Sequence, residues 1–345
     1  MSTRIVDLRS DTVTRPTPAM YVAMQSAPLG DDVLGDDPTV IELEAESARI
    51  MGKEAALFVP SGSMGNQICL AVQTQPGEAA LFEDEAHMIY YEAGAPAVIA
   101  QVICRTVIGK NGVMDPNKLE QKISKGSVHT PRTAIICVEN THNRAGGAVI
   151  PMDMLRAYRH IADRNEVKLH MDGARVFNAS AALGIDVKEI ADQCDTMSFC
   201  LSKALGSPVG SVIVGNQEFI TKARLWRKRL GGGMRQSGIL AACGLVSLKQ
   251  MRERLPEDHM RATKLAIMLS ELPGLRVDLE QQHTNFVMVE VEKPADFWIE
   301  ELAKENVLAM AFNSNLLRLI THYDIYDEDI ENAFISFNKI IQRLV

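Results

Sequence analysis

Two polar residues that end apolar runs have the chemistry to hold a reactive cofactor. In KLHMDGAR an apolar run ends at Asp172, and in TMSFCLSK a second run ends at Ser202 and Lys203. If both runs are strands of an open α/β sheet, these residues lie at the strand ends where such sheets bind ligands. A lysine amine can condense with an aldehyde, and a carboxylate can pair with a protonated pyridine nitrogen, which strengthens the ring as an electron sink. Pyridoxal 5'-phosphate (PLP) carries both groups, so Asp172 and Lys203 together predict a PLP site.

A PLP site also needs groups that hold the phosphate. VPSGSMGNQ follows the apolar run ALFVP and opens a predicted helix. Gly62 lets the backbone approach closely, Ser63 supplies a hydroxyl, and a helix N-terminus offers free N–H groups. The segment is neither a Walker loop nor a GxGxxG fingerprint, so it does not predict nucleotide binding. Taken singly, Gly62 and Ser63 could form an ordinary turn, Lys203 could begin a loop and Asp172 could cap a helix; their combination favours PLP.

Histidine side chains could position the cofactor ring or move a proton. His87, in FEDEAHMIYYEAG, follows another apolar run and could stack on the pyridine ring, or it could be a solvated loop residue. His87 and His142, the latter in ENTHNRAGG, are candidates for the base of the reaction because imidazole titrates near neutral pH. An activated water is an equal candidate, and His142 could instead be a structural turn residue. Tyr91 could line the same pocket.

Three arginines could bind anionic groups. Arg175 lies three residues after Asp172 and could reach the cofactor or a substrate carboxylate. Arg318 lies in the apolar run LLRLITH, where a buried charge is costly unless it is paired, and a guanidinium suits bidentate capture of an α-carboxylate. Arg235, in WRKRLGGGMRQSG, could present its charge to a phosphate. Arg318 on an edge strand facing solvent, and Arg235 in an exposed flexible loop, are the alternatives.

GDDVLGDDPT carries four aspartates among glycines. Cation binding and helix capping at Asp37 and Thr39 are both possible, and capping is the more common use of these residue types. Whether the segment binds a cation stays open, and no metal is assigned to the PLP site.

The elements that must position these residues alternate between apolar runs and helical patterns. Many of the runs are apolar throughout, as expected when helices cover both faces of a mostly parallel sheet, so the class is α/β. The predicted strands are 54–60, 78–83, 97–104, 133–139, 168–172, 196–202 and 210–215, and the predicted helices are 39–51, 64–75, 152–165, 217–230 and 235–254.

The length of 345 residues exceeds the roughly 250–300 at which one core usually stops growing, so two packed domains are expected. After about residue 255 the pattern gives a helix, a strand at 285–291, a helix at 295–305, a strand at 316–321 and a last helix from 327. We therefore predict an N-terminal arm (1–20) that contributes to the active site, a large PLP-binding α/β domain (21–250) and a small C-terminal α+β domain (251–345).

Composition excludes several classes of partner. With 46% apolar and 23% charged residues the chain is typical of globular proteins, and a net charge of -8 opposes binding to nucleic acid or anionic membranes. There is no signal-peptide pattern and no apolar run of about 18 residues. The six cysteines lack metal-ligand spacing, which favours free thiols in a reducing cytosol. We expect a cytoplasmic protein that acts on a small molecule.

With these motifs assembled, the chain resembles the low-specificity L-threonine aldolases of PLP fold type I. The resemblance implies a lyase of amino-acid metabolism that cleaves L-threonine, L-allo-threonine and related β-hydroxy-α-amino acids between Cα and Cβ, giving glycine and an aldehyde. It also implies a homotetramer with active sites at a dimer interface. The matching stretches, between residues 7 and 322, are DLRSDTVTRP, GDDVLGDDPT, EDEAHMIYYEAG, ENTHNRAGG, DGARVFNA, CLSKALGSPVGS, GGGMRQSG and LRLITH.

The same resemblance assigns roles to individual residues. Lys203 would bind the cofactor aldehyde, Asp172 its pyridine nitrogen, and His87 would stack on its ring. The remaining roles are phosphate binding by Gly62, Ser63 and, from a neighbouring subunit, Arg235, and substrate-carboxylate binding by Ser10, Arg175 and Arg318.

Three positions depart from the family pattern and bear on substrate preference. Leu34 stands where family members often carry an aromatic residue, Ser63 replaces threonine, and Tyr91 stands where phenylalanine can occur. The sequence leaves open which β-hydroxy amino acid is preferred. Another PLP reaction, β-elimination or racemisation of a small amino acid, and an inactive PLP-fold scaffold remain as alternatives.

Overall fold

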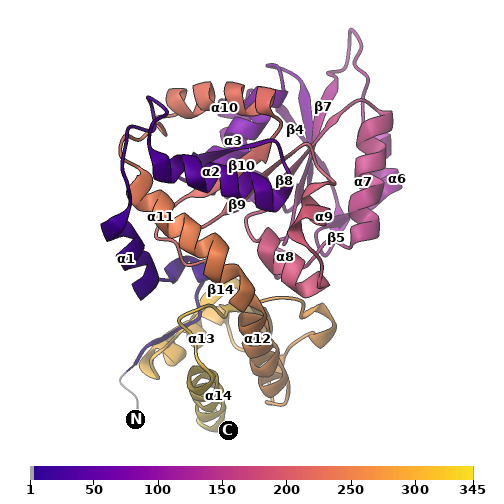
Figure 1. The fold of residues 1–345 in the computed structure, drawn as a ribbon. Coiled ribbons are helices and arrows are strands. Elements are labelled where there is room, and N and C mark those ends of the chain that lie inside the picture. The colour runs from indigo at the N-terminus through magenta and orange to yellow at the C-terminus, as the bar shows by residue number, and fades with distance from the viewer. Residues whose placement is uncertain (1–3, 345) are drawn as a thin grey trace.

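The computed structural model describes residues 4–344, and its largest element is a seven-stranded sheet (Figure 1). The strand order is β2-β10-β9-β8-β7-β3-β4; β10 is antiparallel to both of its neighbours, and the other adjacent pairs are parallel. The prediction of a mostly parallel α/β sheet is therefore confirmed. The strands are β2 (Ala55–Val59), β3 (Ala79–Glu83), β4 (Ile103–Val107), β7 (Thr133–Glu139), β8 (Lys168–Asp172), β9 (Thr196–Cys200) and β10 (Ser211–Gly215).

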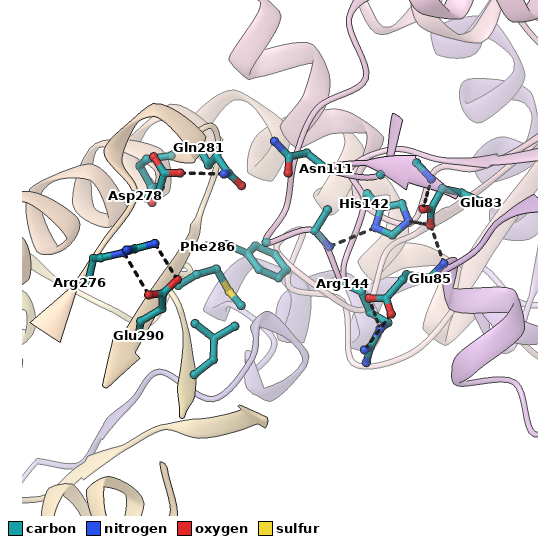
Figure 2. Close-up of a pocket in the computed structure, with 17 residues that line it drawn as sticks. Glu83, Glu85, Asn111, His142, Arg144, Arg276, Asp278, Gln281, Phe286 and Glu290 are labelled. Carbon is teal, nitrogen blue, oxygen red and sulfur yellow. Dashed lines mark hydrogen bonds and ion pairs between the residues drawn. The ribbon is translucent and has the colours of Figure 1, made fainter. Parts of the chain in front are cut away.

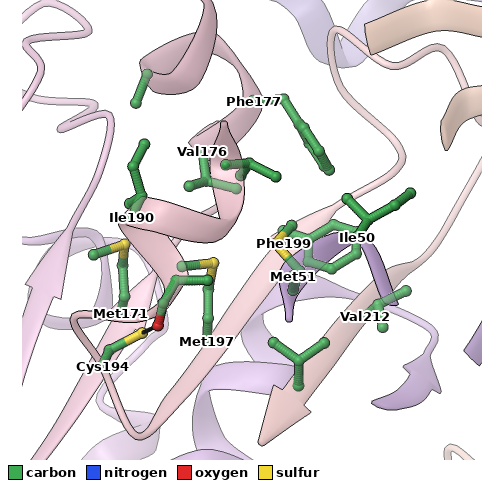
Figure 3. Packing of buried hydrophobic residues seen from close by; sticks show 14 of the residues in the cluster. Ile50, Met51, Met171, Val176, Phe177, Ile190, Cys194, Met197, Phe199 and Val212 are labelled. Carbon is green, nitrogen blue, oxygen red and sulfur yellow. Dashed lines mark hydrogen bonds between the residues drawn. The ribbon is translucent and has the colours of Figure 1, made fainter. Parts of the chain in front are cut away.

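Helices cover both faces of this sheet. Successive strand residues point to opposite faces, and because the strands are apolar throughout, each face needs a covering layer. On one face Met197 and Phe199 of β9 pack in a core with Met51 and Phe177 from the covering helices (Figure 3). On the other face Leu57 and Ile213 pack with apolar residues of α3 and α10. The first face is covered by α2 (Pro38–Met51), α7 (Met152–Arg164), α8 (Val176–Leu183), α9 (Val187–Ala191) and α11 (Gly238–Val246), and the second by α3 (Gly62–Gln73) and α10 (Gln217–Arg229).

Helix α3 lies unusually close to the sheet. A Cβ atom added at Gly65 would be 2.7 Å from Ser198 Oγ and 2.9 Å from Ile213 Cγ2, so only glycine permits this approach. The close contact brings the first turns of α3 beside the carboxyl ends of β8 and β9.

The C-terminal elements form a second, antiparallel sheet in the order β11-β12-β15-β14. Figure 1 shows these elements gathered below the large sheet, where strand β1 (Val6–Asp7) and helix α14 also lie. Their bounds are α12 (Leu255–Ser270), β11 (Leu275–Arg276), β12 (Phe286–Val291), α13 (Ala295–Lys304), β13 (Val307–Leu308), β14 (Met310–Asn313), β15 (Leu316–Ile320) and α14 (Asp327–Gln342).

The N-terminal segment is anchored on this C-terminal part. Strand β1 (Val6–Asp7) pairs in parallel with β13, and Val6 and Leu8 are buried in the C-terminal core. Because the chain is fixed there, the residues that follow Leu8 are directed toward the large sheet.

Two predicted elements differ from the structure. The strand predicted at 97–104 begins later, as β4, because Gly94 and Pro96 start the short helix α5 (Ala95–Val98) and Gln101 adopts a left-handed turn. The helix predicted at 235–254 begins at Gly238 and continues through a π-turn and a 3-10 turn into α12. The predicted domain boundary at 250/251 therefore falls inside a continuous helical segment, and the division into domains stays a prediction.

The remaining elements are short. They are a 3-10 turn at Asp11–Val13, α1 (Pro18–Ser26), α4 (His87–Tyr90), β5 (Gly109–Lys110), β6 (Val113–Met114), α6 (Pro116–Lys122) and a 3-10 turn at Leu279–Gln281.

Of the helices between residues 4 and 344, none has the length and apolar character needed to cross a lipid bilayer. The six cysteines are free thiols, as predicted.

Candidate active site

A cavity of about 320 Å³ lies at the carboxyl ends of β8 and β9. It brings together five of the residues predicted to bind PLP, although they come from four separate stretches of the chain. These residues are Gly62, Ser63, His87, Asp172 and Lys203.

One wall of the cavity is the first turn of α3. Ser61 is the N-cap, and its Oγ accepts a hydrogen bond from Met64 N at 3.3 Å. The first N–H groups of a helix have no partner within the helix, so they can bind an anion. A Cβ atom at Gly62 would lie 3.0 Å from Cys200 Sγ, so a larger side chain would crowd this wall.

Asp172 is a buried carboxylate that forms no ion pair with a lysine or arginine among residues 4–344. Its Oδ1 accepts from Ala174 N at 3.1 Å, and its Oδ2 accepts from Asn66 Nδ2 at 2.9 Å. A buried carboxylate without a cationic partner is costly. It is therefore suited to a cationic group of a ligand, such as a protonated pyridine.

The donor set of this cavity fits PLP. Lys203 can bind an aldehyde, Asp172 can bind a pyridine nitrogen, and the N-terminus of α3 can bind a phosphate. The three functions border one cavity, as the cofactor requires.

His87 borders this cavity and a second one beside it. Its backbone N–H donates to Glu139 Oε2 at 2.7 Å, its ring Nδ1 is 3.1 Å from Glu92 Oε1, and its ring centroid is 5.4 Å from that of Tyr91. Burial alone would lower the pKa of His87. The hydrogen bond to Glu92 and the carboxylates of Asp172 and Glu139 outweigh burial and raise that pKa above its ordinary value.

The second cavity, of about 260 Å³, shares His87 and Lys203 with the first. It collects the four residues predicted to bind the substrate from the N-terminal segment, the large sheet and the C-terminal sheet. These residues are Ser10, Tyr91, Arg175 and Arg318.

Arg318 is a buried cation that lacks a carboxylate partner within the described part of the chain. It donates to Asn143 Oδ1 at 3.2 Å and to the carbonyl oxygen of Arg9 at 3.4 Å, and its Nε has no partner. Burial and the nearby charge of Arg175 lower the pKa of Arg318. The guanidinium is therefore available for an anionic ligand.

Arg175 borders the same cavity but is already paired. Its Nε and Nη2 donate to the two carboxylate oxygens of Asp11 at 2.7 and 2.6 Å, and both side chains are buried. Burial alone would raise the pKa of Asp11, but the guanidinium of Arg175 lowers it to about 2. Ser10 lies beside this pair and caps the 3-10 turn, accepting from Thr12 N at 3.2 Å.

His142 lies outside both cavities. Its Nε2 is 3.0 Å from Glu83 Oε2, and its Nδ1 accepts from Ala145 N at 3.2 Å, so both ring nitrogens are occupied. It borders a third cavity of about 470 Å³, between the loops of the large sheet and the C-terminal sheet. Figure 2 shows three pairs of charged side chains in this third cavity: His142 with Glu83, Arg144 with Glu85, and Arg276 with Glu290.

Arg235 also lies outside both cavities of the site. Its side chain is 64% exposed, and Nη1 is 3.0 Å from Asp31 Oδ2. In the same aspartate-rich segment, Asp37 caps α2 by accepting from Thr39 N and Val40 N, each at 3.1 Å, which confirms the predicted capping for Asp37. Thr39 is not a cap, since its Oγ1 donates to the carbonyl oxygen of Pro28 at 2.7 Å. Asp32 pairs with Arg227 at 2.9 Å.

Several polar residues of the site were not predicted. Asn66, Gln67 and Glu92 are buried and bonded to one another. The signal for the first two was available, since two adjacent amide side chains at the start of an otherwise apolar helix must find partners when they are buried. The other residues that border the second cavity and were not predicted are Thr12, Asn143, Met310, Ala311 and Phe312.

The fold and the two cavities define a PLP-dependent enzyme of fold type I. The structure superposes on the threonine aldolase of Leishmania major with a TM-score of 0.84 at 18% identity, covering 98% of this chain and 99% of that one. It also matches the serine palmitoyltransferase of Sphingomonas wittichii with a TM-score of 0.78 at 14% identity, covering 99% and 88%.

Sequence comparison gives the family. Residues 7–294 match the β-eliminating lyase family. The low-specificity L-threonine aldolase 1 of Arabidopsis thaliana is 45% identical over 98% of this chain and 97% of its own length, and the low-specificity L-threonine aldolase of Escherichia coli K12 is 42% identical over 98% and 100%. The chain belongs to the β-eliminating lyase family, in the group of the low-specificity L-threonine aldolases.

Replacing Asp11 by Asn should destabilise the protein, because Arg175 would remain buried without its partner. We expect a loss of about 3–5 kcal/mol in the free energy of unfolding near neutral pH, measured by denaturant titration. The pKa of Asp11 in the folded protein, about 2, lies below its ordinary value of 3.8, so the pair stabilises fully above about pH 4 and loses its contribution as pH falls toward about 2. The difference between wild type and D11N should therefore shrink over that range.

A Glu46→Gln variant is the control, because Glu46 pairs with Arg49 on an exposed helix surface. An unchanged difference between wild type and D11N down to about pH 2 would contradict the ion-pair account.

Proposed function

We propose that this protein is a PLP-dependent low-specificity L-threonine aldolase that cleaves L-threonine and L-allo-threonine to glycine and acetaldehyde. The observation that carries this proposal is the buried Arg318, which has no carboxylate partner among residues 4–344 and borders the same cavity as Lys203 and His87. An amino acid bound there by its carboxylate would have its amine and α-carbon beside the lysine. The names of the relatives given above support the same reaction.

The cofactor side of the site would work as follows. PLP, when bound, supplies an electron sink for bonds at the α-carbon of an amino acid. Lys203 would hold its aldehyde, and Asp172 would keep its pyridine nitrogen protonated. Gly62 and Ser63, at the start of α3, would bind its phosphate, and His87 would lie against its ring.

The substrate side would be formed by Arg318, Arg175 and Ser10. Arg318 supplies a guanidinium that forms no ion pair among residues 4–344, whereas Arg175 is partly neutralised by Asp11 and adds positive potential and hydrogen bonds. Fixing the carboxylate orients the α-carbon relative to the cofactor, and orientation of this kind can contribute several kcal/mol to catalysis. Tyr91 would bound the space for the β-substituent.

The cleavage also needs a base for the proton of the β-hydroxyl. His87 is the favoured residue because it borders both cavities and its Nε2 has no hydrogen-bond partner among residues 4–344. A water activated by His87 would serve equally. His142 is disfavoured, since both of its ring nitrogens are engaged and it borders a different cavity.

We also propose a cytoplasmic homotetramer that acts in threonine catabolism and glycine formation, with active sites at a dimer interface. Arg235 would then bind the phosphate of the neighbouring subunit. The side chain is exposed, and its one partner among residues 4–344 is Asp31, which leaves it accessible to a second copy. In this proposal each domain contributes to the site: the arm (1–20) supplies Ser10, the large domain (21–250) binds PLP, and the small domain (251–345) supplies Arg318.

Product analysis tests the reaction. The purified holoenzyme, incubated separately with L-threonine and L-allo-threonine, should form acetaldehyde and glycine in equal amounts, and Lys203→Ala should abolish both. Ammonia with a keto acid would instead identify elimination, and inverted substrate would identify racemisation. Purified protein without the visible absorption of lysine-bound PLP would indicate an inactive scaffold.

Replacing Arg318 by Gln should weaken binding of the substrate carboxylate. We expect KM for L-threonine to rise about 10- to 100-fold, since a hydrogen bond to a charged group contributes roughly 1.5–3 kcal/mol. Steady-state kinetics measure the change. Arg276→Gln is the matched control, because Arg276 is exposed and pairs with Glu290 outside both cavities. A kcat/KM for R318Q within about twofold of wild type would contradict the assignment.

A mixing experiment tests the role of Arg235. If Arg235 acts across the interface, Lys203→Ala and Arg235→Ala subunits, each inactive or nearly so alone, should form hybrid dimers with one intact site. Random mixing by co-expression should then restore about one quarter of wild-type activity, because half of the dimers are hybrids. Activity that stays at the level of the parent variants would show that Arg235 does not act on the neighbouring subunit.

A further inference from the structure

Glu92 is a buried carboxylate next to the candidate base. It is 5% exposed and follows helix α4. Three side chains donate to it: Asn66 Nδ2 at 2.8 Å, Gln67 Nε2 at 2.5 Å and His87 Nδ1 at 3.1 Å. Within residues 4–344 its one ion pair is the one with His87, because its other two partners are neutral amides.

The Asn66 amide lies between the carboxylates of Glu92 and Asp172 and the buried ring of His170. Burial lowers the pKa of His170 to about 4, so this ring is neutral near pH 7. Its Nδ1 is 3.0 Å from Thr196 Oγ1 and its Nε2 is 3.3 Å from Asn66 Oδ1. Carboxylate oxygens accept hydrogen bonds, so the Asn66 nitrogen faces Glu92 and Asp172, and the Asn66 oxygen faces the His170 ring.

The hydrogen bond to Glu92 also determines which ring nitrogen of His87 carries a proton. An ionised carboxylate only accepts hydrogen bonds, so the His87 nitrogen that faces Glu92, Nδ1, carries a proton. The other nitrogen, Nε2, is then the basic atom of the neutral ring. A histidine tautomer is set in this way by the hydrogen bond that its second nitrogen makes.

We propose that Glu92 is a positioning residue of the active site, which fixes the orientation and tautomer of His87 and is linked through Asn66 to the carboxylate of Asp172. The proposal rests on the aldolase function stated above and adds a residue that acts through His87. Because Nδ1 of His87 is bound and Nε2 has no hydrogen-bond partner within the described residues, His87 can accept the proton of a substrate hydroxyl, or of a water, only at Nε2.

The charges around His87 come from four elements. Glu92, Asp172 and Glu139 favour the protonated ring, whereas Lys203 disfavours it. Removing the charge of Glu92 should therefore lower the pKa of His87. If the neutral ring is the base, activity increases with pH through this pKa, and a lower pKa moves the acidic limb of the pH profile to lower pH.

The test compares Glu92→Gln with wild-type holoenzyme. We expect kcat to fall about tenfold or more, KM to change little, and the acidic limb of kcat/KM to shift to lower pH. Glu44→Gln is the matched control, since Glu44 is an equally buried glutamate that accepts from Phe58 N and does not contact His87. It should leave both the limb and kcat in place.

A second measurement does not depend on catalysis. The rate at which diethylpyrocarbonate modifies His87, followed against pH by peptide mass spectrometry on the full-length protein freed of cofactor, gives the pKa of that imidazole. This pKa should be lower in E92Q than in wild type and unchanged in E44Q. Should E92Q fail to fold, Glu92→Asp keeps the charge at a shorter reach, and it should keep the acidic limb while lowering kcat.

The two experiments distinguish a wrong role for Glu92 from a wrong reaction. A holoenzyme that forms no acetaldehyde and glycine refutes the aldolase function, whereas the modification experiment still reports on Glu92 and His87. A loss of activity in E92Q with an unmoved acidic limb and an unchanged His87 pKa would show that Glu92 is only structural and would overturn the proposal.

Discussion

Buried charges that form no ion pair with a lysine, an arginine or a carboxylate among residues 4–344 are the constraint on which the site depends. Asp172 and Glu92 are carboxylates enclosed by amides and a histidine, and Arg318 is a guanidinium enclosed by an amide and a carbonyl. Each arrangement satisfies hydrogen bonds but leaves net charge, which is costly in a protein interior. A protonated pyridine on one side of Lys203 would neutralise Asp172, and an α-carboxylate on the other side would neutralise Arg318. Ligand binding thus offsets the unfavourable free energy of burying these charges.

The parallel sheet makes this arrangement possible. Three neighbouring strands, β3, β7 and β8, each end in a carboxylate: Glu83, Glu139 and Asp172. Glu139, the middle one, accepts from the backbone N–H groups of both His87 and Asn143, and the Asn143 side chain in turn accepts from Arg318. The adjacent strand ends therefore hold the cofactor side and the substrate side at a fixed separation.

Much of the fold was predictable because its signals are local. The strands at 133–139 and 168–172 were placed with their observed bounds, since each is a short apolar run ended by a polar residue. The strand predicted at 97–104 was wrong because Pro96 and Gly94 favour a turn of helix over an equally apolar strand. Apolar character alone does not distinguish the two.

The site was predictable in its residue types but not in its pairings. Lys203, Asp172, His87 and Ser63 were found because each lies at or just after the end of a strand, or in the first turn of a helix. The pairing of Arg175 with Asp11 joins residues 164 positions apart, and no local pattern in the sequence reports it. The contact of His142 Nε2 has the same origin, since Glu83 reaches it from another strand.

The position of the N-terminal segment explains why the site needs the whole chain. Val6 and Leu8 pack in the C-terminal core, and Ile320 N donates to the carbonyl oxygen of Leu8 at 2.8 Å. Two residues after Leu8, Ser10 enters the second cavity, and Asp11 pairs with Arg175 of the large sheet. The same short segment therefore fixes the C-terminal sheet, which carries Arg318, relative to the sheet that carries Asp172. A change that loosens this segment would move the carboxylate site relative to the cofactor site, even though it touches neither ligand.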